Sequence, residues 1–289
     1  MKIIRTISEI KEELNKAKEK SIGYVPTMGF LHEGHLSLVE KARAENDIVV
    51  MSIFVNPLQF GPNEDFEQYP RDEEHDKTLA EQAGVDLLFV PTVDVMYPEE
   101  VGIELSVSKG TDMLCGRSRP GHFDGVATVL TKFFHIVNPN RVYFGLKDAQ
   151  QFSVVHTLIS QLNFPIELVG LPTVRESDGL AKSSRNVYLS EAERKEATVL
   201  YRALQAGREQ LTNGIKESQS LVAEVKEYIN EHTNAKIDYV ELLSYPTLNK
   251  INIIDEQIIL AVAVQYDHAR LIDNIILSPN GEQIDTIIK

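Results

Sequence analysis

Two histidines follow a glycine turn near the start of the chain, in the segment Pro26-Thr27-Met28-Gly29-Phe30-Leu31-His32-Glu33-Gly34-His35. This segment connects an apolar run, expected as a strand, to an expected helix. The first turn of a helix has unpaired backbone N–H groups and a partial positive charge, so it binds anions. Imidazoles beside it can donate hydrogen bonds to phosphoryl oxygens. The segment predicts a nucleotide-phosphate site, although a turn with two satisfied surface histidines would contain the same residues.

A second candidate phosphate site lies at 179–186, where Lys182-Ser183-Ser184-Arg185 brings together an ammonium, two hydroxyls and a guanidinium. These groups can surround a polyphosphate with charge-assisted donors. On its own the segment would equally suit a solvated polar loop at a domain junction. The two segments together resemble the HIGH and KMSKS signatures of the nucleotidylyltransferase superfamily. That resemblance implies that both contact one triphosphate.

Two more polar segments follow expected strands. Gly145 would let a nucleoside approach the backbone, Lys147 can reach phosphate or carboxylate, and Asp148 can accept from ribose hydroxyls or simply cap the next helix. Asn56 and Gln59 end another apolar strand and supply neutral donors and acceptors suited to a small hydroxy acid.

Composition excludes several classes of function. The 289 residues carry 43 Asp and Glu against 29 Lys and Arg, a net charge of −14, which disfavours nucleic acid as a partner. The sequence lacks the roughly 20-residue apolar run of a membrane span, and its start lacks the apolar core of a signal peptide. Cys115 is the single cysteine, so no internal disulfide is possible and a cytoplasmic location is expected. We interpret Cys115 as a packed residue, not a nucleophile.

Short apolar runs alternate with helical patterns through the first 170 or so residues. This alternation predicts βαβ units, hence an α/β fold with a Rossmann-like doubly wound parallel sheet. Ligands bind such sheets at the carboxyl ends of the strands, where the polar segments above lie. The expected elements are strands at 22–26, 48–55, 87–90, 141–144 and 165–171, and helices at 35–45, 73–83, 123–137 and 149–162.

The pattern changes after a hinge near 173–189. Ser190 is a good N-cap for one long helix that runs toward Thr212, and a second helix is expected over Ser218–His232. Three strands are expected at 237–243, 257–264 and 271–277. We therefore divide the chain into residues 1–173, a Rossmann-like domain with the candidate sites at 26–35, 56–59 and 145–148, and residues 174–289, a second, smaller α+β C-terminal domain with the 179–186 segment near the hinge.

The motifs as a set resemble the pantoate–β-alanine ligase (pantothenate synthetase) family in order and spacing, over the whole chain. The matching segments are Pro26-Thr27-Met28-Gly29, His32-x-Gly34-His35, Phe54-Val55-Asn56-Pro57-x-Gln59-Phe60, Tyr69-Pro70-Arg71-Asp72, Arg119-Pro120-x-His122-Phe123-x-Gly125-Val126, Gly145-x-Lys147-Asp148-x-x-Gln151, Ser183-Ser184-Arg185-Asn186, Asp238-Tyr239-Val240-Glu241 and Arg270-Leu271-Ile272-Asp273-Asn274.

This resemblance implies a two-step ligation. ATP and pantoate would give pantoyl adenylate and pyrophosphate, and β-alanine would then give pantothenate and AMP. It also implies Mg²⁺ bound through the ATP phosphates, without a separate protein metal site, and a homodimer joined through the N-terminal domain. A lid over the intermediate is expected at 61–72.

The resemblance also implies roles for individual residues. The groups that stabilise the reacting phosphate would be His32, His35, Lys147, Ser183 and Arg185. The ATP site would further include Pro26, Thr27, Met28, Gly29, Gly145, Asp148, Val174, Lys182 and Ser184. The substrate-binding residues would be Met28, Asn56, Gln59, Arg119 and Gln151. Lys182 replaces a hydrophobic residue of many relatives, so it would either contact the triphosphate or point to solvent.

Three alternatives remain open. The chain could be another nucleotidylyltransferase, such as a cofactor-forming adenylyltransferase or a truncated aminoacyl-tRNA synthetase. It could be a zinc protein built on His32, His35, Cys115 and His122, although their spacing matches no compact tetrahedral site. It could also be a catalytically silent nucleotide-binding regulator.

Overall fold

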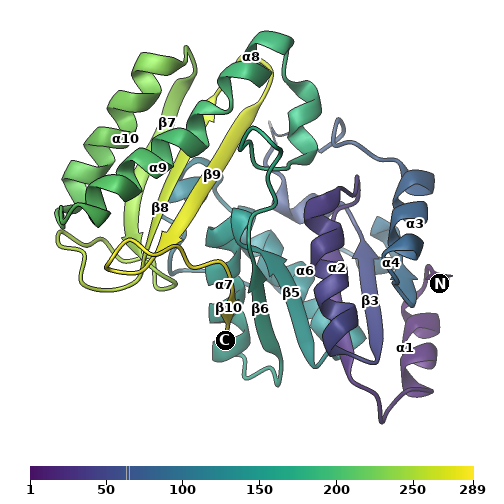
Figure 1. The fold of residues 1–289 in the computed structure, drawn as a ribbon. Helices are drawn as coiled ribbons and strands as arrows, with labels where there is room; N and C mark the ends of the chain where they lie inside the picture. The colour runs from purple at the N-terminus through teal and green to yellow at the C-terminus, as the bar shows by residue number, and fades with distance from the viewer. Residues whose placement is uncertain (63, 65) are drawn as a thin grey trace.

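The computed structural model describes residues 1–62, 64 and 66–289, and within them the strands form two sheets (Figure 1). The large sheet has seven strands in the order β1-β4-β3-β2-β5-β6-β10, and the small sheet has three in the order β7-β8-β9. Neighbours in the large sheet are parallel except β10, which is antiparallel to β6, and the small sheet is antiparallel. The α/β prediction is confirmed. The strands are β1 Lys2–Ile4, β2 Ile22–Thr27, β3 Ile48–Ile53, β4 Leu87–Phe89, β5 Arg141–Gly145, β6 Glu167–Leu171, β7 Lys236–Ser244, β8 Ile258–Gln265, β9 Arg270–Leu277 and β10 Ile287–Ile288.

Helices cover both faces of the large sheet because its central strands are apolar on both sides. Tyr24 faces α1 (Ile7–Asn15), α6 (His122–Val137) and α7 (Ala149–Gln161), while its neighbour Val25 faces α2 (Glu33–Glu45) and α3 (Glu73–Gln82). The same alternation runs through the neighbouring strands, as a two-residue period requires. Among the described residues, no helix is both long and apolar enough to cross a membrane.

The parallel strands bring the polar segments to one edge. β2 lies between β3 and β5, so the carboxyl ends of these three strands are neighbours. A turn into α2 follows β2, the 3₁₀ helix η1 (Pro57–Gln59) follows β3, and the 3₁₀ helix η2 (Leu146–Asp148) follows β5. The register of the sheet thus assembles side chains that lie far apart in sequence.

The small sheet packs against both its own helices and the large-sheet part of the molecule. One face is covered by α9 (Val199–Thr212) and α10 (Ser218–His232). The opposite face contributes Tyr239 and Tyr245 to an apolar cluster that continues into α6 and α7, and the Tyr245 hydroxyl donates to the Ala149 carbonyl at 3.1 Å. The chain then returns to the large sheet as β10. The two predicted domains therefore share a hydrophobic core.

The remaining elements include one correction to the sequence-based expectations. The single helix expected from Ser190 toward Thr212 is two helices, α8 (Glu191–Glu196) and α9. Ser190 is the N-cap of α8, as expected, and it forms a capping box with Glu193. At the break, the Thr198 hydroxyl donates to the Lys195 carbonyl at 3.0 Å, and such side-chain bonds compete with helix continuation. β1, α1, β10, the short helices α4 (Val93–Met96) and α5 (Leu114–Ser118), and the 3₁₀ helix η3 (Ser184–Tyr188) were not anticipated.

Substituting Gly125 by alanine should destabilise the fold, because α6 packs against η1 with no room for a methyl group. A Cβ at Gly125 would overlap the Leu58 carbonyl and lie 2.6 Å from the Gln59 nitrogen. We expect the free energy of unfolding in urea to fall by about 2 kcal/mol, a typical cost of overpacking. Gly102→Ala is the control, since nothing lies within 4 Å of its added methyl. Equal stability of the two variants would contradict the prediction.

Candidate active site

A buried carboxylate organises the turn between β2 and α2. Asp76, on α3, accepts hydrogen bonds from the backbone N–H groups of Phe30 at 2.8 Å and Leu31 at 2.6 Å. Gly29 and Phe30 both have left-handed backbone conformations, with φ of +88° and +51°. A Cβ on Gly29 would lie 2.8 Å from Asp76 Oδ2, so a glycine is required there. Gly29 therefore supports the turn, and it is absent from the lining of the cavity described below.

Backbone hydrogen bonds fix the tautomers of both motif histidines. His32 is the N-cap of α2, and its Nδ1 accepts from the Gly34 N–H at 3.1 Å. His35 Nδ1 accepts from the His32 N–H at 3.2 Å. An accepting Nδ1 carries no proton, so each neutral ring has its proton on Nε2. The helix start thus holds two imidazoles with Nε2–H as the available donor.

Both histidines are held in the neutral form. Removal from water lowers the pKa of His32 from 6.5 to about 4, and the ammonium of Lys147 acts in the same direction. Burial also lowers the pKa of His35 well below its ordinary value, with His32 and Lys147 as secondary causes. At neutral pH these rings donate hydrogen bonds without carrying a charge.

The second candidate phosphate segment, 179–186, lies against the histidine turn. Residues 174–182 form a small hairpin in which the Lys182 N–H donates to the Val174 carbonyl at 2.9 Å. Lys182 Nζ lies 3.3 Å from Glu33 Oε2, and the Ser184 hydroxyl donates to the Phe30 carbonyl at 3.5 Å. The two segments therefore meet in this structure. Lys182 contacts the start of α2 and lines the cavity described below, so its side chain does not point only to solvent.

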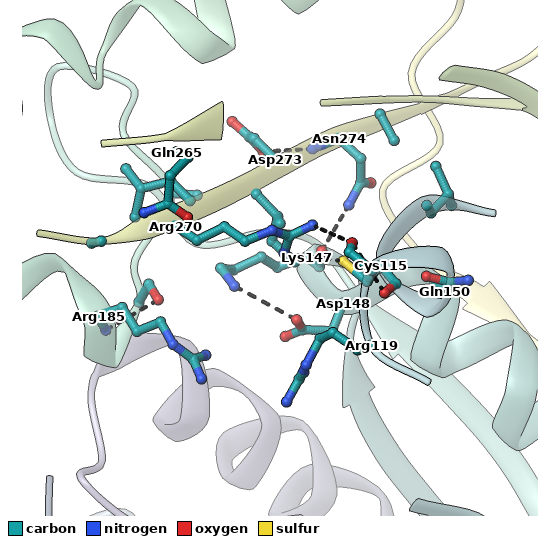
Figure 2. A pocket seen from close by; sticks show the side chains of 18 of the residues that line it. Cys115, Arg119, Lys147, Asp148, Gln150, Arg185, Gln265, Arg270, Asp273 and Asn274 are labelled. Carbon is teal, nitrogen blue, oxygen red and sulfur yellow. Dashed lines mark hydrogen bonds and ion pairs between the residues drawn. The ribbon is translucent and has the colours of Figure 1, made fainter. Parts of the chain in front are cut away.

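Lys147 and Asp148 enter the site from the end of β5. Lys147 Nζ lies 3.6 Å from Asp148 Oδ1, and both side chains point into the space between the two sheets in Figure 2. The Asp148 side chain makes no capping hydrogen bond to α7, although Asp148 is the residue before that helix. The carboxylate is therefore available to a ligand, and the capping alternative is not supported.

The two amides after β3 have different surroundings. Asn56 is 1% exposed, and its side chain donates to the Gly125 carbonyl at 3.0 Å and to Gln59 Oε1 at 3.2 Å, while accepting from Tyr97 at 2.9 Å. Its hydrogen-bonding capacity is used by the protein itself. Among the described residues, Gln59 Nε2 donates to a weak acceptor, Met28 Sδ, at 3.0 Å. Gln59 can bind a ligand directly, whereas Asn56 orients Gln59.

Arg119 belongs to a charged network beside these amides. Its guanidinium forms two hydrogen bonds with the Glu64 carboxylate and lies 3.2 Å from His122 Nε2. His122 Nδ1 donates to the Gln59 carbonyl at 2.7 Å, so Nε2 accepts from Arg119. Burial, followed by the charge of Arg119, lowers the pKa of His122 to about 4. Glu64 lies in the segment expected to form a lid, two of whose residues, 63 and 65, are outside the described part of the chain.

These groups surround two adjoining cavities. The histidine cavity, of about 230 Å³, is lined by every residue that the sequence assigned to the site except Gly29. The inter-sheet cavity, of about 530 Å³, shares Arg119, Lys147 and Arg185 with it and extends to β9 (Figure 2). The predicted residues brought together in the histidine cavity are Pro26, Thr27, Met28, His32, His35, Asn56, Gln59, Arg119, Gly145, Lys147, Asp148, Gln151, Val174, Lys182, Ser183, Ser184 and Arg185.

The zinc alternative finds no support in this geometry. Across residues 1–62, 64 and 66–289, no group of three His, Cys, Asp or Glu side chains is arranged to hold a metal ion. Cys115 lies instead on α5, with its sulfur 3.3 Å from the Tyr239 hydroxyl.

Comparison with known proteins identifies the family. The model of the family described as pantoate-beta-alanine ligase matches residues 2–276. The chain belongs to the pantoate–β-alanine ligase family. Curated members named pantothenate synthetase include one from Geobacillus sp. (strain WCH70), 60% identical over 258 residues, which are 89% of this chain and 92% of the relative. Another, from Bacillus subtilis (strain 168), is 60% identical over 279 residues, or 96% of this chain and 97% of the relative. This member of the family is therefore a ligase.

Solved structures of family members share the fold. Pantothenate synthetase from Thermus thermophilus has a TM-score of 0.91 and 47% identity, covering 95% of this chain and 99% of that one. The ligase from Francisella tularensis, described as complexed with beta-gamma ATP and beta-alanine, has a TM-score of 0.80 and 34% identity, covering 96% and 99%.

The sequence-based reasoning gave no role to several residues that shape the ligase site. Asp76 lies four residues before the buried Ala80 of α3, and an acidic residue on the apolar stripe of a helix is the signal that could have found it. His122 was named only in a family motif and in the zinc alternative. Asn274 donates to the carbonyl oxygens of Leu146 and Lys147, a contact between segments 127 residues apart that no local pattern indicates.

The neutral histidines predict an acid-sensitive fold. The unfolded chain gains protons on its histidines as pH falls below about 6.5, whereas folded His32 and His122 resist protonation down to about pH 4. The contribution of these histidines to the free energy of unfolding should therefore be at its maximum above pH 6.5. It should decrease as the pH falls toward 4. A pKa difference of one is about 1.4 kcal/mol, so each histidine should account for about 3 kcal/mol.

Urea unfolding at several pH values checks this prediction. His32→Gln should make the decline between pH 6.5 and 4 shallower. His232→Gln, at an exposed position on α10, is the matched control and should leave the slope unchanged. An equal slope in wild type and His32→Gln would show that His32 is not held neutral.

Proposed function

We propose that this ligase joins pantoate to β-alanine through a pantoyl-adenylate intermediate and releases pyrophosphate and AMP. The observation that carries the proposal is the direct contact between the histidine turn and the Lys182–Arg185 segment, at Lys182 with Glu33 and at Ser184 with Phe30. Two groups of phosphate donors from separate parts of the chain thereby line one cavity with Lys147. A single triphosphate is the ligand that uses all of them.

The chemistry explains why phosphate donors are needed. A carboxylate oxygen of pantoate attacks the α-phosphorus of ATP, and the bond to the bridging oxygen breaks as pyrophosphate leaves. Negative charge accumulates on the phosphoryl oxygens, so fixed donors lower the barrier. His32 and His35 would donate through Nε2–H, and the cations would come from Lys147, Lys182 and Arg185. The hydroxyl of Ser183 would add a further donor.

The remaining lining residues would bind the organic parts of the substrates. We assign the ATP site to the residues around the ends of β2 and β5 and to the hairpin: Pro26, Thr27, Met28, Gly145, Asp148, Val174 and Ser184. Gln59 and Gln151 would bind pantoate, with Met28 beside them and Asn56 acting through Gln59.

In the second step the β-alanine amine attacks the acyl carbon, the bond to the AMP oxygen breaks, and the nitrogen loses a proton. Arg119 is the cation that contacts Gln59 in this region, with Nη2 donating to the Gln59 carbonyl at 3.4 Å. The Arg119 guanidinium now binds the Glu64 carboxylate, and a substrate carboxylate would bind the same guanidinium in its place. A lid at 61–72 would protect the mixed anhydride from water.

The proposal includes Mg²⁺ as a companion of ATP. Mg²⁺ usually keeps several waters and binds through substrate phosphates and one or two carboxylates. Asp148 fits this mode, because it supplies a carboxylate to the lining of the histidine cavity. When bound, the ion would neutralise part of the phosphate charge.

We also propose that the enzyme is a cytoplasmic homodimer with a domain boundary near residue 173. The free thiol of Cys115 suits a reducing compartment. The change of sheet after β6 supports the boundary. Sedimentation of the purified protein gives the oligomeric state directly.

Omitting each substrate in turn tests the reaction. ATP with pantoate alone should release about one equivalent of pyrophosphate per active site, because the adenylate remains bound until an amine arrives. Addition of β-alanine should make the release continuous, whereas ATP with β-alanine alone should release none. Pyrophosphate release that does not depend on pantoate would contradict the proposed order of steps.

Lys182→Met tests the contribution of the additional cation. A charge-assisted hydrogen bond contributes about 1.5–3 kcal/mol, so we expect the KM for ATP to rise about tenfold or more while the KM for β-alanine changes little. Lys195→Met, at an exposed position on α8, is the matched control. An unchanged KM for ATP would mean that Lys182 serves only its contact with Glu33.

A further inference from the structure

Two adjacent residues of β9, Asp273 and Asn274, lie at the wall of the inter-sheet cavity without a part in the proposed chemistry. They are 3% and 7% exposed. β9 forms the edge of the small sheet, and Figure 2 shows both side chains above the Lys147 segment. Buried polar side chains of this kind need partners, and the partners here are η2, which carries Lys147, and the hairpin that leads into the Lys182–Arg185 segment.

Asn274 holds the backbone that carries Lys147. Its side-chain amide nitrogen donates to the Leu146 carbonyl at 3.1 Å and to the Lys147 carbonyl at 2.8 Å. Both protons of the amide are therefore used, and both acceptors belong to η2. This contact fixes the backbone from which the Lys147 side chain extends.

Asp273 holds the other segment through Arg175. Its two carboxylate oxygens accept from the guanidinium at 2.7 and 3.0 Å, and one of them also accepts the Asn274 N–H at 2.8 Å. Arg175 pairs with Ala181 across the small hairpin and donates to the Gly179 carbonyl at 3.1 Å. The hairpin leads directly into Lys182, so Asp273 fixes the base of the Lys182–Arg185 segment.

Both η2 and the hairpin before Lys182 are therefore held by adjacent residues of one strand, β9. The guanidinium of Arg175 also lies 3.8 Å from the centre of the Tyr201 ring on α9, which restricts it further. A displacement of β9 would move the Lys147 backbone and the base of the Lys182 segment together. Effective catalysis needs charged groups held to within a fraction of an ångström of the productive geometry.

We propose that Asp273 and Asn274 are positioning residues that act as one unit, coupling Lys147 to the Lys182–Arg185 segment for the adenylation step. This inference rests on the proposed function, because it concerns how that site is held for its first step. The two residues touch neither ATP nor pantoate in this account. Their effect is on the relative position of the groups that do.

Asn274→Leu removes both amide donors at similar volume, and Asp273→Asn keeps the shape while weakening the pair with Arg175. Each should lower the rate of pantoate-dependent pyrophosphate release at saturating substrates at least tenfold. The double variant should be no more than about twofold slower than the slower single variant, because either change alone uncouples the segments. Independent roles would instead multiply the two losses.

Ser244→Ala is the matched control in the same sheet. Ser244 is fully buried on β7, and within the described residues its hydroxyl bonds to Thr247 and accepts the Asn249 N–H, both in the same turn. It should lose stability in urea while keeping the rate within twofold of wild type.

A rate within twofold of wild type in folded Asn274→Leu would overturn the inference, as would multiplicative losses in the double variant. The inference would also be overturned if Ser244→Ala slowed pyrophosphate release as much as Asn274→Leu at the same loss of stability. The slowing would then be a result of general destabilisation. Asp273→Asn supplies the comparison should Asn274→Leu not fold. Wild-type protein that releases no pyrophosphate with ATP and pantoate would overturn the proposed function itself.

Discussion

The site depends on the buried carboxylate of Asp76 beneath the left-handed turn of Gly29 and Phe30. Without that acceptor, the backbone N–H groups of Phe30 and Leu31 would lose their partner. The turn would also lose the contact that stabilises a left-handed conformation at Phe30, which phenylalanine rarely adopts. The turn sets where α2 begins. The start of α2 in turn sets both imidazoles, because their Nδ1 atoms accept from its first backbone N–H groups. An interaction outside the cavity thus determines the donor geometry inside it.

Neutral and charged hydrogen-bond donors come from different residues in this site. Burial keeps His32 and His35 neutral by lowering the pKa of each, so each ring presents an uncharged donor to the cavity. The charge comes from lysine and arginine on other elements. This division is consistent with a chain of net charge −14, because cations concentrated at one place can attract a polyanion while the rest of the surface does not.

The sequence was sufficient to predict at which edge of the large sheet the cavity lies and which residues form much of its lining. Short apolar runs located the strands, and parallel pairing brought their carboxyl ends together. It could not separate lining residues from supporting ones. Asn56 carries the same amide group as Gln59, but its amide is hydrogen-bonded within the protein. Gly29 supports the turn through its left-handed backbone conformation and does not line the cavity. The helix break at Thr198 and the contacts of Asp76 and Asn274 depend on tertiary packing, which a local pattern does not contain.

The shared apolar core limits how the two parts of the ligase can move. A connection without such a core would let the small sheet rotate freely about the segment near residue 173. Here Tyr239 and Tyr245 pack into the cluster of α6 and α7, so the small sheet is attached through its face as well as through the chain. Large rotation would expose that cluster to water. β9 belongs to the same packing, because its Ile276 lies in this cluster and the strand is paired with β8 along its whole length. The hairpin before Lys182 and the Lys147 backbone, which Asp273 and Asn274 hold, are therefore anchored to a strand that is itself fixed by the shared core.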